Sequence, residues 1–420
     1  MKVAVNTAKL LRNVPLPDEI QTVHDNAVVI DMGTSLTRIG FGGEDSPRLL
    51  YPSIVGAHPT DRNAPLECFN KAQQHRESLH CSRVLSKGLV QDWNAWTAMM
   101  QSLFDQLNLY KDPNAPLLIS EVALAPREQR EKMVEILFEQ VQAQAVYFST
   151  APVMAMYASG RTSGMVIEMG AESCHTVPVF EGLGLFHSFL ELDYGGDDLT
   201  TVFSQSVMRQ PGNQHLRFSP HHEKFIFQYA KELHVCVQPD AGSFALSVSE
   251  GNQHDVVHHK LPDGAVMKLG PDRYRIAESF FDPAHVGRDG SKGIQHLAVE
   301  SVNKCDVDIA PLLLGNVVLS GGASLTKGMP ERVSRELQDL TAGSSGGGGG
   351  AAAAGGTGGA MRVSSDKVRV YAATERRHAT WVGGSILSSL PTFQDFWITK
   401  ADYDEAGPEV RRALGHRNCI

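Results

Sequence analysis

Apolar residues recur along this chain with two different spacings, and each spacing predicts one kind of element. Short continuous apolar runs, such as residues 27–30 and 117–119, predict buried strands. Apolar residues three and four positions apart over residues 93–107, and again over residues 128–141, predict amphipathic helices. Strands that alternate with helices in this way are typical of sheets covered by helices. The pattern therefore predicts an α/β protein.

Two of the predicted strands run into a turn that opens on a carboxylate and contains a glycine. The first turn reads Asp31-Met32-Gly33-Thr34-Ser35, and the second reads Glu168-Met169-Gly170-Ala171-Glu172. A glycine after a buried strand permits a tight hairpin whose backbone amides can face a phosphate. One such turn is common in ordinary hairpins, but the pair predicts a duplicated fold with a nucleotide held between its halves.

A third segment has the composition of a ligand-binding turn. Residues 316–319 are strand-like and lead into Ser320-Gly321-Gly322-Ala323-Ser324, and a helical pattern follows over residues 329–340. A strand, a glycine pair and a helix start can hold a flat ligand against exposed backbone. The three segments together indicate a nucleotide site.

Composition narrows the class of protein. The 420 residues suffice for two domains with a large core, and the 42% hydrophobic and 20% charged fractions are ordinary for a soluble protein. A formal net charge of -9 argues against nucleic-acid binding by the whole surface. No apolar run reaches the roughly 18 residues of a membrane span, and residues 1–17 lack a signal-peptide core. Six cysteines without paired metal-site spacing fit free thiols in a reducing compartment, cytosol or nucleus.

Two segments fall outside the strand and helix patterns. Residues 1–26 precede the first predicted strand, and we expect an N-terminal extension that is a loose tail. Residues 341–360 are rich in glycine and alanine and have no apolar periodicity. They cannot bury enough surface to offset their ordering entropy, so we expect a disordered surface loop.

Several longer stretches resemble actin and the actin-related proteins, from about residue 27 to the end of the chain. The resemblance is densest in Tyr51-Pro52-Ser53-Ile54-Val55-Gly56, Tyr157-Ala158-Ser159-Gly160-Arg161-Thr162, Lys304-Cys305-Asp306-Val307-Asp308-Ile309, Val318-Leu319-Ser320-Gly321-Gly322, Trp381-Val382-Gly383-Gly384-Ser385-Ile386-Leu387, and the stretch from Trp397 to Ile420. It implies the duplicated two-domain α/β fold that actin shares with hexokinase and a family of heat-shock proteins, with a nucleotide cleft between the halves.

The resemblance also implies a division of the chain. The large half would have its core in residues 27–52, 84–158 and 379–420, with a small lobe at 53–83 that carries a shortened loop. The other half would have its core in residues 159–194 and 285–378, interrupted by the loop at 341–360, with a second lobe at 195–284.

At the phosphate end of the site, the resemblance implies that the two turns clamp ATP or ADP together with Mg²⁺ or Ca²⁺. Asp31 and Glu168 would face the metal through water. Arg38 stands where the family has a lysine, Glu168 where it has an aspartate, and Ala171-Glu172 where it has aspartate-glycine. These changes alter phosphate binding, and a merely structural second hairpin is the alternative. The implied phosphate ligands are Gly33, Thr34, Ser35, Arg38, Gly170, Ala171 and Glu172.

At the base end, the matches to the family are closer. Lys231-Glu232 resembles the pair that contacts ribose and base, although without the resemblance it would be read as a solvated helix pair. Arg377 replaces the lysine that flanks adenine. The implied nucleoside ligands are Gly196, Lys231, Glu232, Gly321, Gly322, Ala323, Ser324, Leu325 and Arg377.

Hydrolysis needs a group that positions a water in line with the γ-phosphate. The family uses a glutamine, and Ala151 stands at that position. His175 matches a histidine that assists in the family and is a residual catalytic candidate; a structural role is the alternative. Since alanine has no hydrogen-bonding side chain, we expect no catalytic residue and little or no ATP hydrolysis.

Filament contacts are altered as well. The lobe after Gly56 is shorter than in actins and polar at His58-Pro59-Thr60-Asp61-Arg62-Asn63. The segment His285-Val286-Gly287-Arg288-Asp289-Gly290 is charged where actins carry an apolar plug, and burying it in a filament would be costly. Lys87 replaces a histidine. We therefore expect poor homopolymerisation.

These features together predict an actin-related protein that is a nucleotide-binding structural subunit of a cytoskeletal complex, either motor-associated or axonemal. Its partners would be other protein subunits, including actin-binding or motor-associated proteins that dock an amphipathic helix near Tyr157-Ala158-Ser159-Gly160. We expect a cytoplasmic, cytoskeletal location. The alternatives are a nuclear subunit of a chromatin-remodelling complex and a polymerising, ATP-hydrolysing actin, with a sugar kinase as a more distant one.

Overall fold

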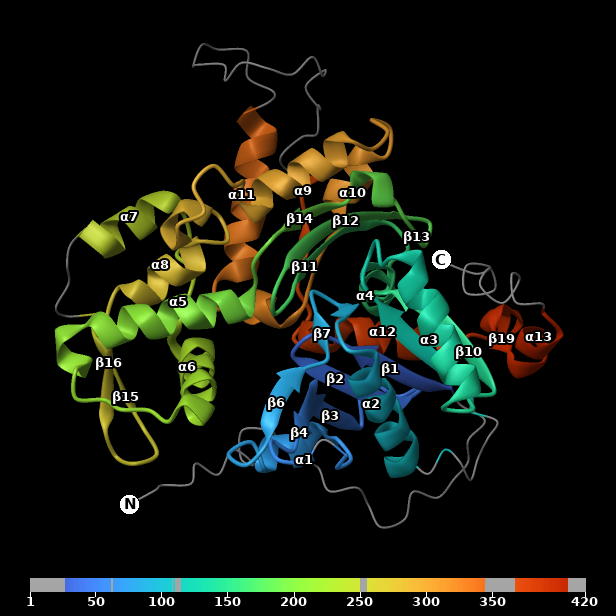
Figure 1. Ribbon diagram of the computed structural model, residues 1–420. Coiled ribbons are helices and arrows are strands. Elements are labelled where there is room, and N and C mark those ends of the chain that lie inside the picture. Colours follow the sequence, from blue (N-terminus) through green and yellow to red (C-terminus); the bar gives the residue numbers. More distant parts are fainter. Residues whose placement is uncertain are drawn as a thin grey trace. The chain divides into compact units, whose positions relative to one another are not determined.

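The computed structural model describes residues 27–61, 63–107, 109, 115–249, 255–343 and 367–406, which form two compact units (Figure 1). The N-terminal unit contains the described residues up to Arg161, residues 182–184, and those from His378 onward. The central unit contains residues 162–181 and the described part of 185–377. The predicted N-terminal tail, residues 344–360 of the predicted loop, and the actin-like carboxyl end at 416–420 lie outside the described residues.

A mixed sheet is the frame of the N-terminal unit. Its strand order is β19-β10-β9-β1-β2-β3. β1 is parallel to β9 and β9 to β10, whereas the β1–β2 and β2–β3 pairs are antiparallel. The strands are β1 (Val28–Met32), β2 (Leu36–Phe41), β3 (Leu49–Pro52), β9 (Leu117–Glu121), β10 (Ala145–Thr150) and β19 (Ile398–Thr399).

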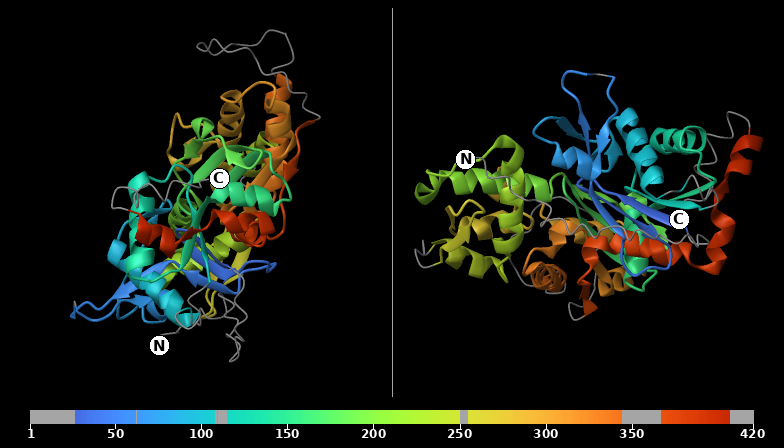
Figure 2. Two further views of the ribbon diagram at one scale, coloured as in Figure 1. Left: turned by 90° about the vertical axis from the view of Figure 1, so that its right-hand side faces the viewer. Right: turned by 90° about the horizontal axis from the view of Figure 1, so that it is seen from below.

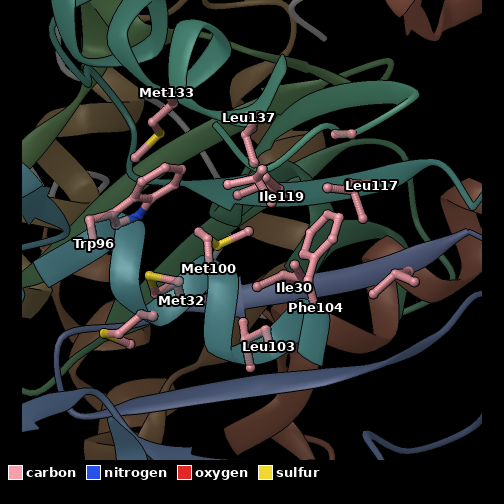
Figure 3. Close-up of a cluster of buried hydrophobic side chains, with 14 of the residues drawn as sticks. Ile30, Met32, Trp96, Met100, Leu103, Phe104, Leu117, Ile119, Met133 and Leu137 are labelled. Atoms are coloured by element: carbon pink, nitrogen blue, oxygen red, sulfur yellow. The ribbon is translucent and has the colours of Figure 1, made fainter. Parts of the chain in front are cut away.

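Helices cover both faces of this sheet because side chains alternate along each strand. Val28 and Ile30 join one buried cluster with α2 and α3, and Val29 joins another with α4 and α12. Figure 3 shows Met100 and Phe104 of α2 beside Ile30 in the first cluster. The helices of this unit beyond its small lobe are α2 (Trp93–Gln106), α3 (Arg127–Glu139), α4 (Ala151–Ala158), α12 (Ala379–Ser388) and α13 (Lys400–Glu405).

The Trp381-Val382-Gly383-Gly384 motif has a packing role in α12. Trp381 is fully buried and donates from Nε1 to the carbonyl of Val29 at 3.0 Å. A Cβ at Gly383 would overlap the backbone of Met154 in α4, so only glycine permits this close approach. The motif therefore fixes α12 against both the sheet and α4.

Smaller elements complete the N-terminal unit. β4 lies between β5 and β6 in a small antiparallel sheet, and β7 pairs with β8 in a hairpin. The bounds are β4 (Ile54–Ala57), β5 (Glu67–Cys68), α1 (Phe69–Gln74), β6 (His80–Arg83), β7 (Leu85–Ser86), β8 (Leu89–Val90) and β13 (Leu183–Gly184).

The sheet of the central unit repeats the topology of the first. Its strands are β11 (Gly164–Met169), β12 (Cys174–Phe180), β14 (Leu190–Leu192), β17 (Val317–Ser320) and β18 (Val370–Tyr371). The order β14-β12-β11-β17-β18 has two antiparallel pairs followed by two parallel pairs, as does β3-β2-β1-β9-β10. The predicted duplication of an α/β fold is confirmed.

Helices pack on this sheet and continue into a lobe of the same unit. Figure 1 shows α9 and α10 beside the strands, and Figure 2 shows the light-green and yellow helices from α5 to α8 gathered together. The bounds are α5 (Gly196–Arg209), α6 (Pro220–His234), α7 (Ala241–Ser249), β15 (Val257–Lys260), β16 (Val266–Leu269), α8 (Asp272–Glu278), α9 (Ile294–Asn303), α10 (Ala310–Gly315) and α11 (Met329–Gly343).

Element boundaries differ from the sequence predictions at a few places. β1 and β11 continue through Asp31 and Glu168, so these acids belong to strands and not to turns. α11 extends to Gly343, three residues into the predicted disordered loop, because Leu337 and Thr341 remain buried on its inner face. In the described part of the chain, no helix has the length and apolar character needed to cross a bilayer.

Arg332 of α11 is the largest charged side chain buried in the described structure. Its guanidinium forms a two-bond ion pair with Glu278 at 2.6 and 2.9 Å and also bonds to Glu336 at 2.7 Å. It lies over the ring of Phe281 at 4.5 Å. This network joins α11 to the end of α8, and therefore the lobe helices to the sheet-covering helices of the central unit.

Replacing Arg332 with methionine is expected to lower the free energy of unfolding by about 3–5 kcal/mol, because Glu278 would keep a buried carboxylate without its main cation. Chemical denaturation followed by circular dichroism would measure it. Arg335→Met is the matched control on the same helix. Arg335 pairs with Asp240 at an exposed position, so its loss should cost under about 1 kcal/mol. Equal costs for the two variants would contradict the assignment.

Candidate functional site

The first turn connects β1 to β2 and is held by its own hairpin. The Gly33 amide donates to the carbonyl of Leu36 at 3.1 Å, and Ser53 Oγ donates to the Gly33 carbonyl at 2.6 Å. The Ser35 carbonyl accepts from the Ser53 amide at 3.1 Å. Gly33 therefore shapes this turn, since its amide is already bonded.

Thr34 has a structural bond of its own. Its hydroxyl accepts a hydrogen bond from the amide of Gly88 at 3.2 Å. Gly88 has a φ of 77° and lies in the turn between β7 and β8. This bond ties the first turn to a second hairpin of the same unit, and the hydroxyl keeps its proton for another acceptor.

Asp31 and Arg38 face one another across the β1–β2 ladder. Arg38 Nη1 donates to Asp31 Oδ2 at 2.8 Å, and Ser120 Oγ of β9 donates to Asp31 Oδ1 at 2.8 Å. Arg38 Nε donates to His378 Nδ1 at 3.1 Å. The pair is largely buried, with side-chain exposures of 12% for Arg38 and 9% for Asp31. The sequence analysis did not identify His378, which directly precedes α12 as its N-cap residue.

The second turn, between β11 and β12, anchors a helix. The Gly170 amide donates to the Ser173 carbonyl at 2.9 Å, which closes the hairpin as Gly33 closes the first. The carbonyls of Gly170 and Ala171 accept from the amides of Gly196 and Asp197 at 3.0 and 2.7 Å. The second turn is thus bonded to the first residues of α5. Glu172 lies within this turn and is partly exposed.

Glu168 and His175 occupy the same cross-strand position in the second hairpin as Asp31 and Arg38 in the first. Glu168 Oε2 lies 4.0 Å from His175 Nδ1, which is too far for a hydrogen bond. His175 Nε2 lies 3.0 Å from Ser173 Oγ and 3.4 Å from Glu191 Oε1. Burial lowers the pKa of His175, but the two carboxylates outweigh it and raise the pKa to about 9.

Three predicted segments converge at Gly196. A Cβ there would stand 3.5 Å from Lys231 Nζ, 3.6 Å from Ala323 Cβ and 3.6 Å from the Gly170 carbonyl. Lys231 Nζ donates to the Gly196 carbonyl. Burial lowers the pKa of the Lys231 ammonium. The central unit therefore brings the second turn, the α5 start, α6 and the Gly321 turn to one place.

The turn after β17 is braced by an arginine that the sequence analysis did not name. Gly321 has a φ of 86°, and a Cβ there would overlap the Met169 backbone, so the turn requires glycine. Arg376 donates to Ser324 Oγ at 3.1 Å and to the Ser324 carbonyl at 3.0 Å, and its own carbonyl accepts from the Gly321 amide at 3.1 Å. The only signal in the sequence was its position beside the predicted Arg377.

The remaining predicted nucleoside residues lie on the surface of the central unit. Glu232 is exposed and accepts from Gln228 at 2.9 Å within α6, so it does not pair with Lys231. Gly322 is exposed, and Leu325 is 39% exposed. The Lys231-Glu232 pair is therefore split, with the lysine turned inward and the glutamate turned to solvent.

Ala151 is the first residue of α4 and directly follows β10. It is buried, and its methyl group offers no hydrogen bond. The hydroxyls of Ser149 and Thr150 just before it are also buried, and neither has a hydrogen-bond partner in the part of the chain that the structure describes.

Each unit, taken by itself, offers few side chains that could bind a divalent cation. Among the described residues, no group of three or more His, Cys, Asp and Glu side chains is placed to hold a metal ion. Both oxygens of Asp31 already accept hydrogen bonds, one of them from a guanidinium. Asp31 therefore fits a metal poorly as the structure holds it, and the predicted water-mediated metal role of Asp31 and Glu168 stays a prediction.

Comparison with known proteins agrees with this geometry. A family model described as Actin matches residues 22–414. A relative named centractin, from Saccharomyces cerevisiae, is 32% identical over 396 residues, which cover 92% of this chain and 96% of the relative. With the repeated sheet topology and the three converging segments, these matches establish that the chain belongs to the actin family, as an actin-related protein with the actin-like two-domain α/β fold.

Proposed function

We propose that this actin-related protein binds ATP or ADP and acts as a structural subunit of a cytoskeletal protein complex, with little or no hydrolysis and poor homopolymerisation. Proteins of the actin family bind nucleotide with a divalent metal. The single observation that carries the proposal is the convergence of the second turn, Lys231 and Ala323 on Gly196.

The nucleoside would be held by the central unit. Gly196 has no side chain, and a Cβ there would be in ordinary contact with Lys231 Nζ and Ala323 Cβ, so the nucleoside would lie against the backbone and these two side chains. Lys231 is partly buried, and its Nζ donates to the Gly196 carbonyl. Arg376 and Arg377 add positive charge next to the Gly321 turn, and Arg376 is the addition that the structure makes to the predicted ligands.

Each turn would offer its own contacts to phosphate. In the first turn, Arg38 supplies a guanidinium and Thr34 a hydroxyl proton. In the second, Gly170 and Ala171 use their carbonyls to fix α5, and His175 lies opposite Glu168 across the hairpin. We also propose that the predicted lobes at residues 53–83 and 195–284 flank these sites.

The proposal that this protein hydrolyses ATP weakly or not at all rests on Ala151. A water that attacks the γ-phosphate needs a hydrogen-bonding partner that orients it, and a methyl group at the start of α4 cannot act as one. Bound nucleotide would then act as a stabilising ligand of the folded state.

Poor homopolymerisation is proposed from the segment where actins carry an apolar plug. Here Arg288 lies 5.2 Å from the Tyr194 ring centre and 3.7 Å from Asp193 Oδ2. His285 lies 3.7 Å from Asp282 Oδ2. Arg288 and the two aspartates are charged and partly exposed, and burying them in a filament seam would cost desolvation energy.

The cytoskeletal complex is proposed from family membership and from the yeast relative named centractin. The proposed location is the cytoplasmic cytoskeleton. Affinity isolation of the chain from native extract, with mass spectrometry of copurifying chains, is expected to recover cytoskeletal subunits such as tubulin, motor or capping proteins. Recovery of helicase subunits would instead support a nuclear remodelling complex.

Added Mg-ATP or Mg-ADP is expected to raise the melting temperature of protein that has been freed of nucleotide. At a hundred times its dissociation constant, a ligand that binds only the folded state stabilises it by about 2.7 kcal/mol. Differential scanning fluorimetry would measure this, with Mg²⁺ alone as the control. Absence of any shift, in protein that also carries no nucleotide when purified, would rule out the proposed site.

Restoring the amide with Ala151→Gln is expected to raise phosphate release by on the order of a hundredfold, because the attacking water regains a positioning group. The control is Ala151→Leu, which adds similar bulk without an amide and should release no more phosphate than the wild type.

Light scattering of the wild type should not rise on addition of salt. Brisk wild-type turnover with rising scattering would point to a polymerising actin.

A further inference from the structure

Arg38 is held from two directions and lies against the first turn. Its Nη1 bonds to Asp31 and its Nε to His378, at 2.8 and 3.1 Å. The same Nη1 lies 3.7 Å from where a Cβ on Gly33 would stand, so the guanidinium packs on the turn backbone. A guanidinium has five N–H donors, so these two bonds leave three that have no partner among the described residues.

The same bonds change the electrostatics of Asp31. A guanidinium at 2.8 Å neutralises the carboxylate, and the Ser120 hydroxyl occupies its other oxygen. Mg²⁺ usually keeps several of its waters and is bound by one or two carboxylates together with phosphate oxygens of the substrate. A divalent cation near Asp31 would be repelled by Arg38 in a buried setting where charges are weakly screened. The Arg38 guanidinium therefore already occupies the position beside Asp31 at which a metal ion would bind.

A lysine could not make this arrangement. An ammonium is a point charge at the end of a flexible stem, whereas this guanidinium bonds two fixed acceptors through two of its five N–H donors. The β1–β2 register sets the distance to Asp31, and the segment before α12 supplies the acceptor on His378. Arginine at this position is therefore preorganised for a phosphate.

We propose that Arg38, positioned by His378 and paired with Asp31, is the cation that holds phosphate at the first turn, so that this chain binds adenine nucleotide without a divalent metal. The inference rests on the proposed nucleotide binding and specifies how the phosphate charge is balanced. His378 is a positioning residue, because it touches Arg38 and acts through it.

The test is the affinity of the full chain, freed of nucleotide, for ADP and ATP, measured by isothermal titration calorimetry in Mg²⁺ and again in EDTA. The wild-type dissociation constant is expected to change by less than about threefold between the two buffers, because the guanidinium stays in place. Arg38→Lys is expected to bind at least about tenfold more weakly in EDTA, and Mg²⁺ should recover most of the loss.

The control Arg48→Lys changes an exposed arginine of the same unit that pairs with Glu44, and it should match the wild type in both buffers. His378→Leu removes the acceptor for Arg38 Nε and should weaken binding in EDTA, whereas His378→Gln keeps an acceptor and should restore it. A variant that only mispositions Arg38 should change the ratio of the affinities in the two buffers, whereas a misfolded variant should lose affinity in both. Circular dichroism checks the fold directly.

Loss of wild-type binding in EDTA would overturn this inference and leave the proposed function standing, since the nucleotide would then depend on a metal. An Arg38→Lys variant that behaves as the wild type in both buffers would equally overturn it. Absence of binding in both buffers would overturn the proposed function itself.

Discussion

Each candidate phosphate turn depends on the way its central strand is paired. β1 has antiparallel β2 on one side and parallel β9 on the other, and β11 has β12 and β17 in the same relation. Antiparallel pairing places the turn directly after the strand, and parallel pairing brings the carboxyl end of the next strand to the same edge. Ser120 of β9 reaches Asp31 for this reason. In each unit, the candidate phosphate turn therefore lies at that edge of the sheet.

The repeated register also decides which charges meet. In both hairpins an acid on the first strand faces a basic side chain on the second, Asp31 with Arg38 and Glu168 with His175. The two acid–base pairs differ in how closely their charged groups approach. The first pair makes a direct ion pair at 2.8 Å, whereas Glu168 stays 4.0 Å from the imidazole, and Glu191 and Ser173 share the histidine. The duplication therefore preserves the topology but not the direct ion pair between the acid and the basic side chain.

Small residues in this protein mostly permit backbone approach. Gly383 lets α12 approach α4, Gly195 lets the start of α5 approach Ala171, and Gly321 lets its turn lie on Met169. Ala151 differs from these, because its methyl group gives the first residue of α4 no hydrogen-bonding side chain, although the hydroxyls of Ser149 and Thr150 lie just before it. Under the proposed function, the site would keep its backbone while Ala151 contributes no group that orients water.

The sequence by itself determined the α/β class, the two hairpin turns, the helices at 93–107 and 128–141, and the family, since these depend on local periodicity, glycine positions and contiguous motifs. The tertiary structure alone decided that Arg38 bonds to His378, which is 340 residues away, and that Arg376 braces the Gly321 turn. It alone split Lys231 from Glu232, because the burial of neighbouring helix positions depends on what packs against the helix. Contacts between distant segments leave no periodic trace in the chain, so only the folded arrangement of strands and helices specifies them.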